Sequence, residues 1–155
     1  MALTFPNINI SGDPSEVLCT REEAILWFSS LKGEYEESIS KLGCCSFNLA
    51  FLTKTEIQDM NKRFAGKNKP TNVLSFPSNE DLTEEWFLGD IAICSELIIE
   101  EAISQGKETQ DHLIHIFVHG VLHLLGFDHE EHSSSEQMES LEIKILKKIG
   151  VADPY

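Results

Sequence analysis

The histidines of this chain are concentrated in one stretch whose spacing could bind a metal ion. All six lie within residues 112–132, in the sequence HLIHIFVHGVLHLLGFDHEEH. At 100° per residue, four of them share an arc of about 80° on one helix face: His112, His115, His119 and His123. The other positions of this helix are mostly apolar, which predicts a buried helix. Because buried imidazole nitrogens need polar partners, a bound cation would satisfy several of them at once.

Three of these histidines have the spacing of a catalytic metal site. His119 and His123 project from one helix face, and Gly126 lets the chain turn so that His129 reaches the same ion. The pattern H-x-x-x-H-x-x-G-x-x-H is the ligand spacing of metzincin-type zinc sites. Three neutral imidazoles leave a fourth tetrahedral position open for water, so we expect one zinc ion per chain, although other divalent metals also bind imidazole. The alternatives are satisfied core and capping histidines, or His132 in place of His129.

One feature of zinc peptidases is missing from this motif. Gly120 stands where such enzymes carry the glutamate general base, which disfavours peptide hydrolysis of that kind. Asp128, next to His129, is the candidate catalytic residue, but it could instead orient a ligand imidazole or cap the turn. His112 and His115 could be partners of the ligands, substrate contacts or ordinary buried histidines.

The charge of the chain is negative except in one segment. Twelve basic and 26 acidic residues give a formal net charge of −14, which on its face argues against a polyanionic partner. Between Lys54 and Lys69, however, there are five basic and two acidic residues, and five minus two gives +3. This segment is a candidate cationic surface on an acidic protein, and a solvated loop is the alternative.

Length and composition indicate one globular domain covering residues 1–155. Hydrophobic residues make up 41% of the chain and charged residues 25%. No apolar run reaches the roughly 18 residues of a membrane helix, and the N-terminus has no basic stretch before an apolar one. The four cysteines contain no C-x-x-C pair, so we expect them to be reduced. We therefore expect a cytoplasmic protein with no membrane partner.

Residue periodicity predicts the elements that position the histidines. Strands are expected at residues 3–10, 45–52, 71–76 and 86–94. Helices are expected at residues 15–42 with an interruption at Gly33, at 53–64, at 95–105, at 109–125 and at 133–149. Because the strands come mostly early and the helices mostly late, the predicted fold class is α+β.

Three segments of the chain resemble, in order, the sequence blocks of a known family. NKPTNVLSFP at residues 68–77, LGDIAI at 88–93 and HGVLHLLGFDH at 119–129 are similar to the YbeY family of bacterial metal-dependent endoribonucleases that act in rRNA maturation. The ending ILKKIGVADPY also resembles the C-terminus of that family. The resemblance covers about Phe47 to Tyr155 and is weak in the N-terminal third.

The resemblance implies both a fold and a function. The fold is a small mixed sheet packed with helices, with a zincin-like site of His119, His123 and His129 on a buried helix and the following turn. The function is metal-assisted phosphodiester cleavage of single-stranded RNA, not DNA, in 16S rRNA 3′-end maturation and ribosome quality control. Similar proteins are proposed to act with ribosomal proteins and an Era-type GTPase. The alternatives are a non-catalytic ribosome assembly factor with a structural metal, or a metal-dependent hydrolase of another substrate.

The chain departs from the family pattern in the basic segment. The family usually has an arginine where this chain has Ala65, in RFAGKNKP. Arg63 lies two residues upstream, about 200° away on a helix but on the same face of an extended segment. Arg63 could therefore replace the family arginine only in an extended segment, and otherwise Lys67 or Lys69 must supply the charge. These three cations are the candidate RNA-binding residues, and we expect them across a cleft from the metal.

Overall fold

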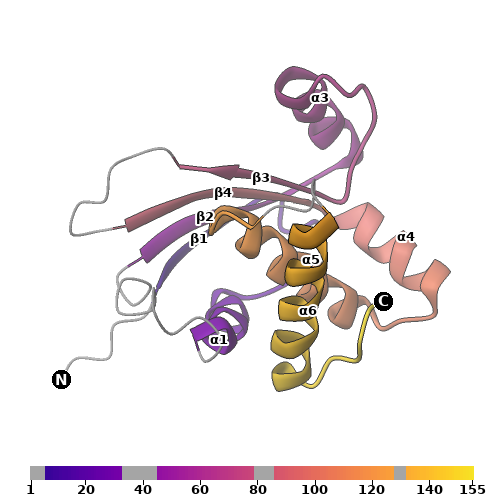
Figure 1. Ribbon diagram of the computed structural model, residues 1–155. Helices are drawn as coiled ribbons and strands as arrows, with labels where there is room; N and C mark the ends of the chain where they lie inside the picture. The colour runs from indigo at the N-terminus through magenta and orange to yellow at the C-terminus, as the bar shows by residue number, and fades with distance from the viewer. Residues whose placement is uncertain (1–5, 33–44, 79–85, 128–131) are drawn as a thin grey trace.

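A four-stranded mixed sheet forms the centre of the protein. The computed structural model describes residues 6–32, 45–78, 86–127 and 132–155 (Figure 1). The strands are β1 (Asn7–Ser11), β2 (Cys45–Leu52), β3 (Val73–Pro77) and β4 (Trp86–Cys94), and their order across the sheet is β1-β2-β4-β3. The pairs β1·β2 and β2·β4 are parallel, whereas β3 runs antiparallel to β4 and forms one edge.

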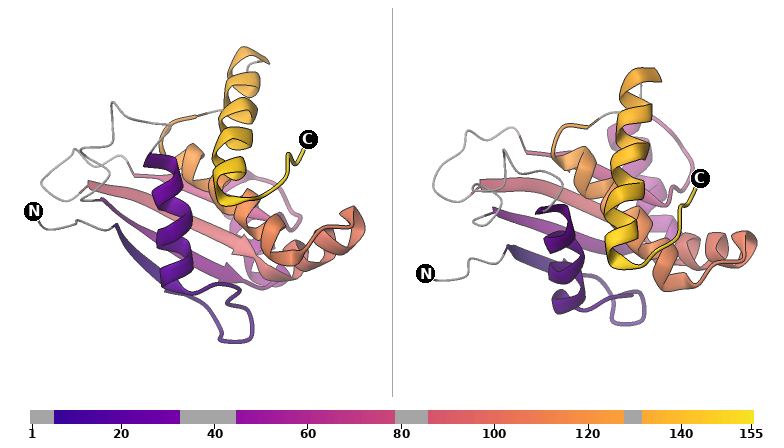
Figure 2. Two further views of the ribbon diagram at one scale, coloured as in Figure 1. Left: turned by 90° about the horizontal axis from the view of Figure 1, so that it is seen from below. Right: turned by 60° about the horizontal axis from the view of Figure 1, so that its bottom comes forward.

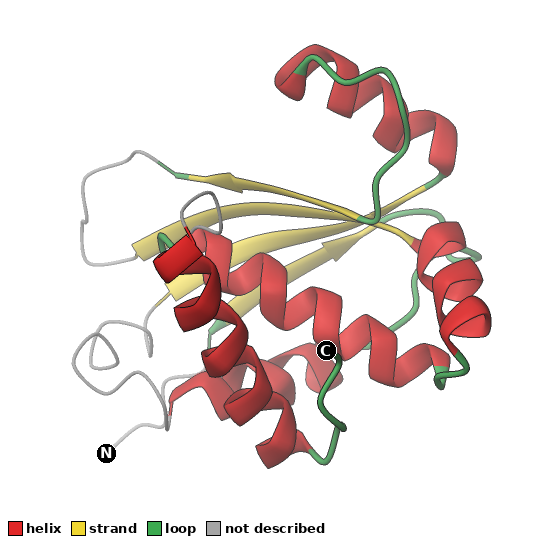
Figure 3. Cartoon of the chain, turned by 45° about the vertical axis from the view of Figure 1, so that its right-hand side comes forward, coloured by secondary structure: helices red, strands yellow, loops and turns green. Residues whose placement is uncertain are grey.

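Five helices are present within the described residues. They are α1 (Arg21–Lys32), α3 (Lys54–Ala65), α4 (Ser95–Gln105), α5 (Thr109–Leu124) and α6 (His132–Ile149). Helices α1, α5 and α6 lie on one face of the sheet, and α3 lies on the other (Figure 3). The views in Figure 2 show α1 and α6 over the same face, with α5 packed beside them. The predicted α+β class with a small mixed sheet is therefore confirmed.

The alternation of side chains along β2 decides which face of the sheet is covered. Cys45, Phe47, Leu49 and Phe51 are buried, and the residues between them are only partly buried. Because successive side chains of a strand point to opposite faces, these four share the face toward the helices. Phe47 packs against Phe117 of α5, with ring centroids 6.1 Å apart. The main core therefore lies between the sheet and α1, α5 and α6.

Helix α5 is buried around most of its circumference, as its composition predicts. Its ten buried residues are His112, Leu113, Ile114, Ile116, Phe117, Val118, Gly120, Val121, Leu122 and Leu124. The sheet lies on one side of α5, whereas α4 and α6 contact it on others. This central position holds the histidine stripe in a fixed orientation. None of the helices in the described ranges is both long and apolar enough to cross a membrane.

The first helix begins later than its apolar pattern predicts. The pattern predicts a start at about Ser15, but α1 begins at Arg21. The backbone N–H and the hydroxyl of Ser15 donate to Asp13 Oδ1, at 2.9 and 2.7 Å, and close a local turn instead. Thr20 and Glu23 form a capping box, since each accepts a hydrogen bond from the backbone N–H of the other, at 3.1 and 3.0 Å. These bonds satisfy the first N–H groups of the helix and set its start.

The other predicted elements agree with the structure in type, with shifts of a few residues at their ends. The first strand is Asn7–Ser11 and the third is Val73–Pro77. Residues 3–5 of the predicted first strand, and the predicted continuation of the first helix as far as Leu42, lie outside the described residues. Cys19, Cys45 and Cys94 are buried free thiols. Cys44 lies outside the described residues, so the reduced state expected for all four cysteines stays a prediction.

Candidate active site

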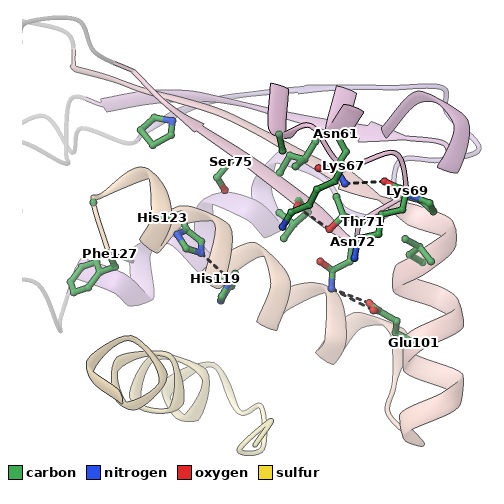
Figure 4. A pocket seen from close by; sticks show the side chains of 17 residues that line it. Asn61, Lys67, Lys69, Thr71, Asn72, Ser75, Glu101, His119, His123 and Phe127 are labelled. Carbon is green, nitrogen blue, oxygen red and sulfur yellow. Dashed lines mark hydrogen bonds between the residues drawn. The ribbon is translucent and has the colours of Figure 1, made fainter. Parts of the chain in front are cut away.

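Helix α5 brings two of the three predicted metal ligands together. His119 and His123 are one turn apart, and their rings lie edge to face with centroids 4.6 Å apart. Their Nε2 atoms approach to 3.1 Å (Figure 4). Both residues line a cleft, so this pair of nitrogens lies at its surface.

The donor set of this pair suits a zinc ion. Two nitrogens that bind one tetrahedral zinc at its usual bond length lie about 3.3 Å from each other. The two Nε2 atoms are already 3.1 Å apart, so little rearrangement is needed for them to share an ion. Neutral imidazole is also the protein ligand that zinc commonly accepts. His119 and His123 therefore fit the metal that the spacing predicts.

The third predicted ligand and the candidate acidic residue are not placed. His129 and Asp128 both lie outside the described residues, and the side chain of His132 is not described either. In the described ranges alone, no group of three or more His, Cys, Asp or Glu side chains is arranged to hold a metal. The zincin-like site of three histidines thus stays a prediction.

A buried carboxylate lies behind His119. Glu142 of α6 is fully buried, and its Oε1 lies 2.5 Å from His119 Nδ1. Its other oxygen, Oε2, accepts a hydrogen bond from the Tyr155 hydroxyl. Burial by itself raises the pKa of this carboxyl, but the interactions with His115, His119 and Tyr155 outweigh it and lower the pKa to about 2. Glu142 is therefore an anion at neutral pH, held between α5 and the tail that follows α6.

The remaining two histidines of the stripe also face carboxylates. His112 Nε2 lies 3.0 Å from Glu101 Oε1. His115 Nε2 lies 3.4 Å from Glu142 Oε2, close enough for electrostatic attraction but without the angles of a hydrogen bond. Neither histidine is among the residues that line the cleft. Of the roles left open by the sequence, partners of other side chains within the core fit His112 and His115 better than substrate contacts.

A cleft of about 1080 Å³ connects the histidine pair to the basic segment. It is lined by Asn61, Ala65, Lys67, Lys69, Pro70, Thr71, Asn72, Val73, Leu74, Ser75, Pro77, Leu97, Glu101, His119, His123, Gly126 and Phe127. Figure 4 shows His119 and His123 on α5, with Lys67 and Lys69 on the segment that follows α3. The edge strand β3 contributes residues between these two groups. Two of the candidate RNA-binding cations and two of the candidate metal ligands thus line one cleft.

The structure resolves which cations reach this cleft. Residues up to Ala65 are helical, and Gly66 ends α3 with a φ of 70°. The extended backbone that Arg63 would need to replace the family arginine is therefore not present. Arg63 is not among the cleft residues, and its Nε lies 3.2 Å from Asp59 Oδ2. Lys67 and Lys69 line the cleft, and so does Ala65 itself.

A buried amide fixes the backbone of the basic segment. Asn61 is 3% exposed and donates from Nδ2 to the carbonyl oxygen of Lys69, at 2.9 Å. The backbone carbonyl oxygen of Asn61 accepts from the backbone N–H of Lys67, at 3.2 Å. These two bonds hold the loop against α3 and fix the backbone at both lysines. The side chains of Lys67 and Lys69 are exposed.

Close packing explains the glycine that replaces the peptidase glutamate. A Cβ atom at Gly120 would lie 3.2 Å from Ile91 Cγ2 and 3.4 Å from Ser75 Oγ. Ser75 also donates a hydrogen bond to the carbonyl oxygen of Gly120, at 3.1 Å. A glutamate here would be directed into the sheet, because the helix touches β3 and β4 at this position. Gly120 therefore serves the close approach of α5 to the sheet.

Sequence reasoning missed Glu142 and Tyr155. One signal was available, because Glu142 falls within the apolar stripe of the last helix, between Met138 and Ile145. An acidic residue at a position predicted to be buried needs a partner in the core. The sequence alone does not say that this partner is His119.

Comparisons with known proteins agree with the resemblance. Residues 15–150 match the family model described as endoribonuclease YbeY. A protein of that name from Francisella tularensis subsp. novicida is 37% identical over 155 residues, covering 96% of this chain and 92% of the relative. One from Francisella tularensis subsp. tularensis is 46% identical over 155 residues, covering 96% and 89%. One from Ruthia magnifica is 42% identical over 128 residues, covering 81% and 88%.

A solved structure supports the fold. The solution structure of TM1509 from Thermotoga maritima has 23% sequence identity and a TM-score of 0.56. The match covers 94% of this chain and 91% of that protein. The family model matches most of the chain. The relatives named above are 37–46% identical to it and align with 81–96% of its length. From its sequence and from the three ordered motifs within it, this chain belongs to the YbeY family.

Proposed function

We propose that this protein is a metal-dependent endoribonuclease that cleaves single-stranded RNA. The observation that carries the proposal is the cleft shared by two convergent imidazoles and two lysines. The name that the family and these relatives carry, endoribonuclease, supports the substrate class. RNA cleavage needs cations near phosphate and a group that stabilises the charge that develops on phosphoryl oxygen.

The metal centre of this proposal consists of His119, His123 and His129, with zinc as the favoured ion. When bound, a divalent metal supplies a Lewis acid that polarises a phosphoryl oxygen and makes water more acidic. His119 and His123 support this assignment through their facing Nε2 atoms. The position of His129 rests on the spacing of the motif.

The other cleft residues bind and orient the RNA. Lys67 and Lys69 hold the phosphate groups by charge-assisted hydrogen bonds. Asp128, beside His129 in sequence, is the proposed proton-transfer residue. Arg63 forms an ion pair with Asp59 and does not line the cleft, so we assign it at most a minor role in RNA binding.

The cellular role in this proposal follows from the family resemblance. We propose that the protein acts in the cytoplasm on the 3′ end of 16S rRNA and in ribosome quality control. Ribosomal proteins and an Era-type GTPase are its proposed partners. A strain that lacks the protein should accumulate 16S rRNA with unprocessed 3′ ends, which can be measured by mapping those ends.

A cleavage assay with metal removal and replacement tests the proposed activity. Protein loaded with zinc is incubated with one sequence prepared as single-stranded RNA, double-stranded RNA and single-stranded DNA, and then again after chelation and after zinc is restored. We expect cleavage of the single-stranded RNA alone, lost with chelator and recovered with zinc. A His123→Ala variant purified in parallel controls for contaminating ribonuclease.

The same assay separates the alternatives. Metal binding without cleavage of any RNA would favour an assembly factor with a structural metal. Cleavage of a peptide with RNA left intact would contradict the ribonuclease proposal, and Gly120 already argues against that outcome because it provides no general base.

A further inference from the structure

Glu142 places a fully buried carboxylate directly behind His119. Isolated buried carboxylates are costly, and they persist where hydrogen bonds and opposite charges compensate for lost hydration. Glu142 is 0% exposed on α6, and its two oxygens contact groups on α5 and on the tail after α6. All of its described partners belong to, or contact, the histidine stripe.

The contact with His119 determines which nitrogen of that ring faces the cleft. Ligand histidines commonly donate their other ring N–H to a carboxylate. The 2.5 Å contact between His119 Nδ1 and Glu142 Oε1 has this arrangement, with Nδ1 as the donor and the carboxyl oxygen as the acceptor. In a neutral imidazole this leaves the lone pair on Nε2. That is the nitrogen that faces His123 Nε2 at 3.1 Å.

The second oxygen of Glu142 is held independently. The Tyr155 hydroxyl donates to Oε2, and the Tyr155 ring lies edge to face with the His115 ring, with centroids 5.7 Å apart. Burial and the bond to Glu142 raise the pKa of Tyr155, so its hydroxyl keeps the proton that it donates. With one oxygen fixed from α5 and the other from the tail, the carboxylate has little freedom to rotate.

We propose that Glu142 is a positioning residue for the metal centre, which orients His119 and fixes its Nδ1–H tautomer, and that Tyr155 holds Glu142 in place. This inference rests on the proposed function only in taking His119 as a metal ligand. Carboxylates that accept from the distal N–H of a ligand histidine orient the ring and make it a stronger ligand. Tyr155 is the more exposed member, at 59%, and connects the tail after α6 to the site.

A Glu142→Gln variant tests the proposal, because the amide keeps the shape of the side chain but removes its charge. Zinc affinity is measured by competition with a chromophoric chelator, and the His119 tautomer is read from imidazole ¹⁵N spectra of the metal-free protein at neutral pH. We expect zinc affinity to fall about 10–100-fold and the Nε2–H tautomer of His119 to become populated. Glu22→Gln, the same charge change at an exposed position of α1, is the matched control and should alter neither readout.

A Tyr155→Phe variant covers the case in which Glu142→Gln does not fold. It removes one hydrogen bond and no charge, so we expect a smaller loss of zinc affinity, still greater than that of Glu22→Gln. The proposal is overturned if Glu142→Gln folds and keeps both the wild-type zinc affinity and the wild-type tautomer. If it does not fold, an unchanged zinc affinity in Tyr155→Phe overturns the proposal instead.

The design separates this inference from the ribonuclease proposal. The tautomer readout needs neither RNA nor metal. Suppose that Glu142→Gln weakens zinc binding and changes the His119 tautomer, but that the wild-type protein cleaves no RNA. That result would contradict only the proposed activity. A wild-type protein that cleaves RNA with no effect of Glu142→Gln would contradict only the positioning role.

Discussion

The two walls of the cleft hold their functional groups in different ways. On α5, His119 has a side chain that is only 20% exposed, and Glu142 fixes its ring from behind. On the opposite wall, Lys67 and Lys69 are exposed, and hydrogen bonds hold the backbone around them rather than their side chains.

This difference matches the interactions proposed for the two walls, which are metal coordination on α5 and phosphate binding by the lysines. A metal ligand must be placed to within a few tenths of an ångström, because coordination bonds have defined lengths and angles. Attraction between a lysine and a phosphate acts over about 10 Å at moderate salt, so a mobile side chain suffices. Substitutions on the α5 wall should therefore abolish activity at any salt concentration, whereas substitutions on the lysine wall should give graded, salt-dependent losses.

The largest effect is expected from His119→Ala. Loss of one of the proposed ligands should remove most of the bound zinc and lower the cleavage rate by at least about 10²-fold, since transition-state charge is no longer stabilised. Metal content is measured by elemental analysis and cleavage by the initial rate on single-stranded RNA. A variant that keeps full zinc occupancy and full rate would show that His119 is not a ligand.

The double variant Lys67→Ala/Lys69→Ala is expected to have the next largest effect. Binding to single-stranded RNA should weaken roughly tenfold at low salt, and the slope of log affinity against log salt should fall by about 1.4, or about 0.7 per lost contact. Zinc content should not change. RNA binding is measured by fluorescence anisotropy over a range of salt concentrations.

Lys62→Ala is the matched control for that double variant, because Lys62 is exposed in the same segment but does not line the cleft. It should leave the salt slope unchanged. An equal loss of slope in Lys62→Ala would mean that the whole basic segment attracts RNA, rather than the two lysines of the cleft.

Ala65→Arg is expected to increase activity. Ala65 lines the cleft at the position where the family usually has an arginine, so a guanidinium here could bind phosphate through two hydrogen bonds. We expect cleavage at limiting RNA to rise about 3–10-fold. Ala65→Gln provides a long side chain without charge, and an equal gain in that variant would contradict a role for the charge.

The smallest effect is expected from Arg63→Ala. Arg63 is exposed and pairs with Asp59 one turn away on the same helix, and such surface pairs contribute little to stability. Cleavage rate and RNA affinity should stay within about twofold of the wild type. A loss of RNA affinity as large as that of the lysine double variant would show that Arg63 contacts RNA although it lies on α3 outside the cleft.

Several features of the fold and the site follow from local sequence. His119 and His123 converge because residues four apart lie on one face of any helix. The start of α3 follows from the capping box of Thr53 and Glu56, in which each side chain satisfies a backbone N–H of the other residue. The alternation along β2 likewise predicts which of its faces is buried. Such features depend on residues a few positions apart, so a single sequence contains the information for them.

Other features depended on how distant elements pack. The pairing of His119 with Glu142 joins residues 23 positions apart on two helices, and the shared cleft joins Lys67 to α5 across the edge of the sheet. The glycine at position 120 is explained only by the sheet that packs against it, which leaves little room for a side chain. Periodicity also placed the start of the first helix too early, because side-chain hydrogen bonds of Asp13 closed a turn there.

The chain thus determined by itself which residues can do chemistry and which of them share a helix face, since both follow from residue type and helix period. Only the tertiary structure decided which carboxylate supports His119, which cations reach the cleft and why a glycine occupies position 120. Each of those outcomes depends on the relative placement of separate helices and strands, and that placement is set by the packing of the whole core rather than by any local pattern.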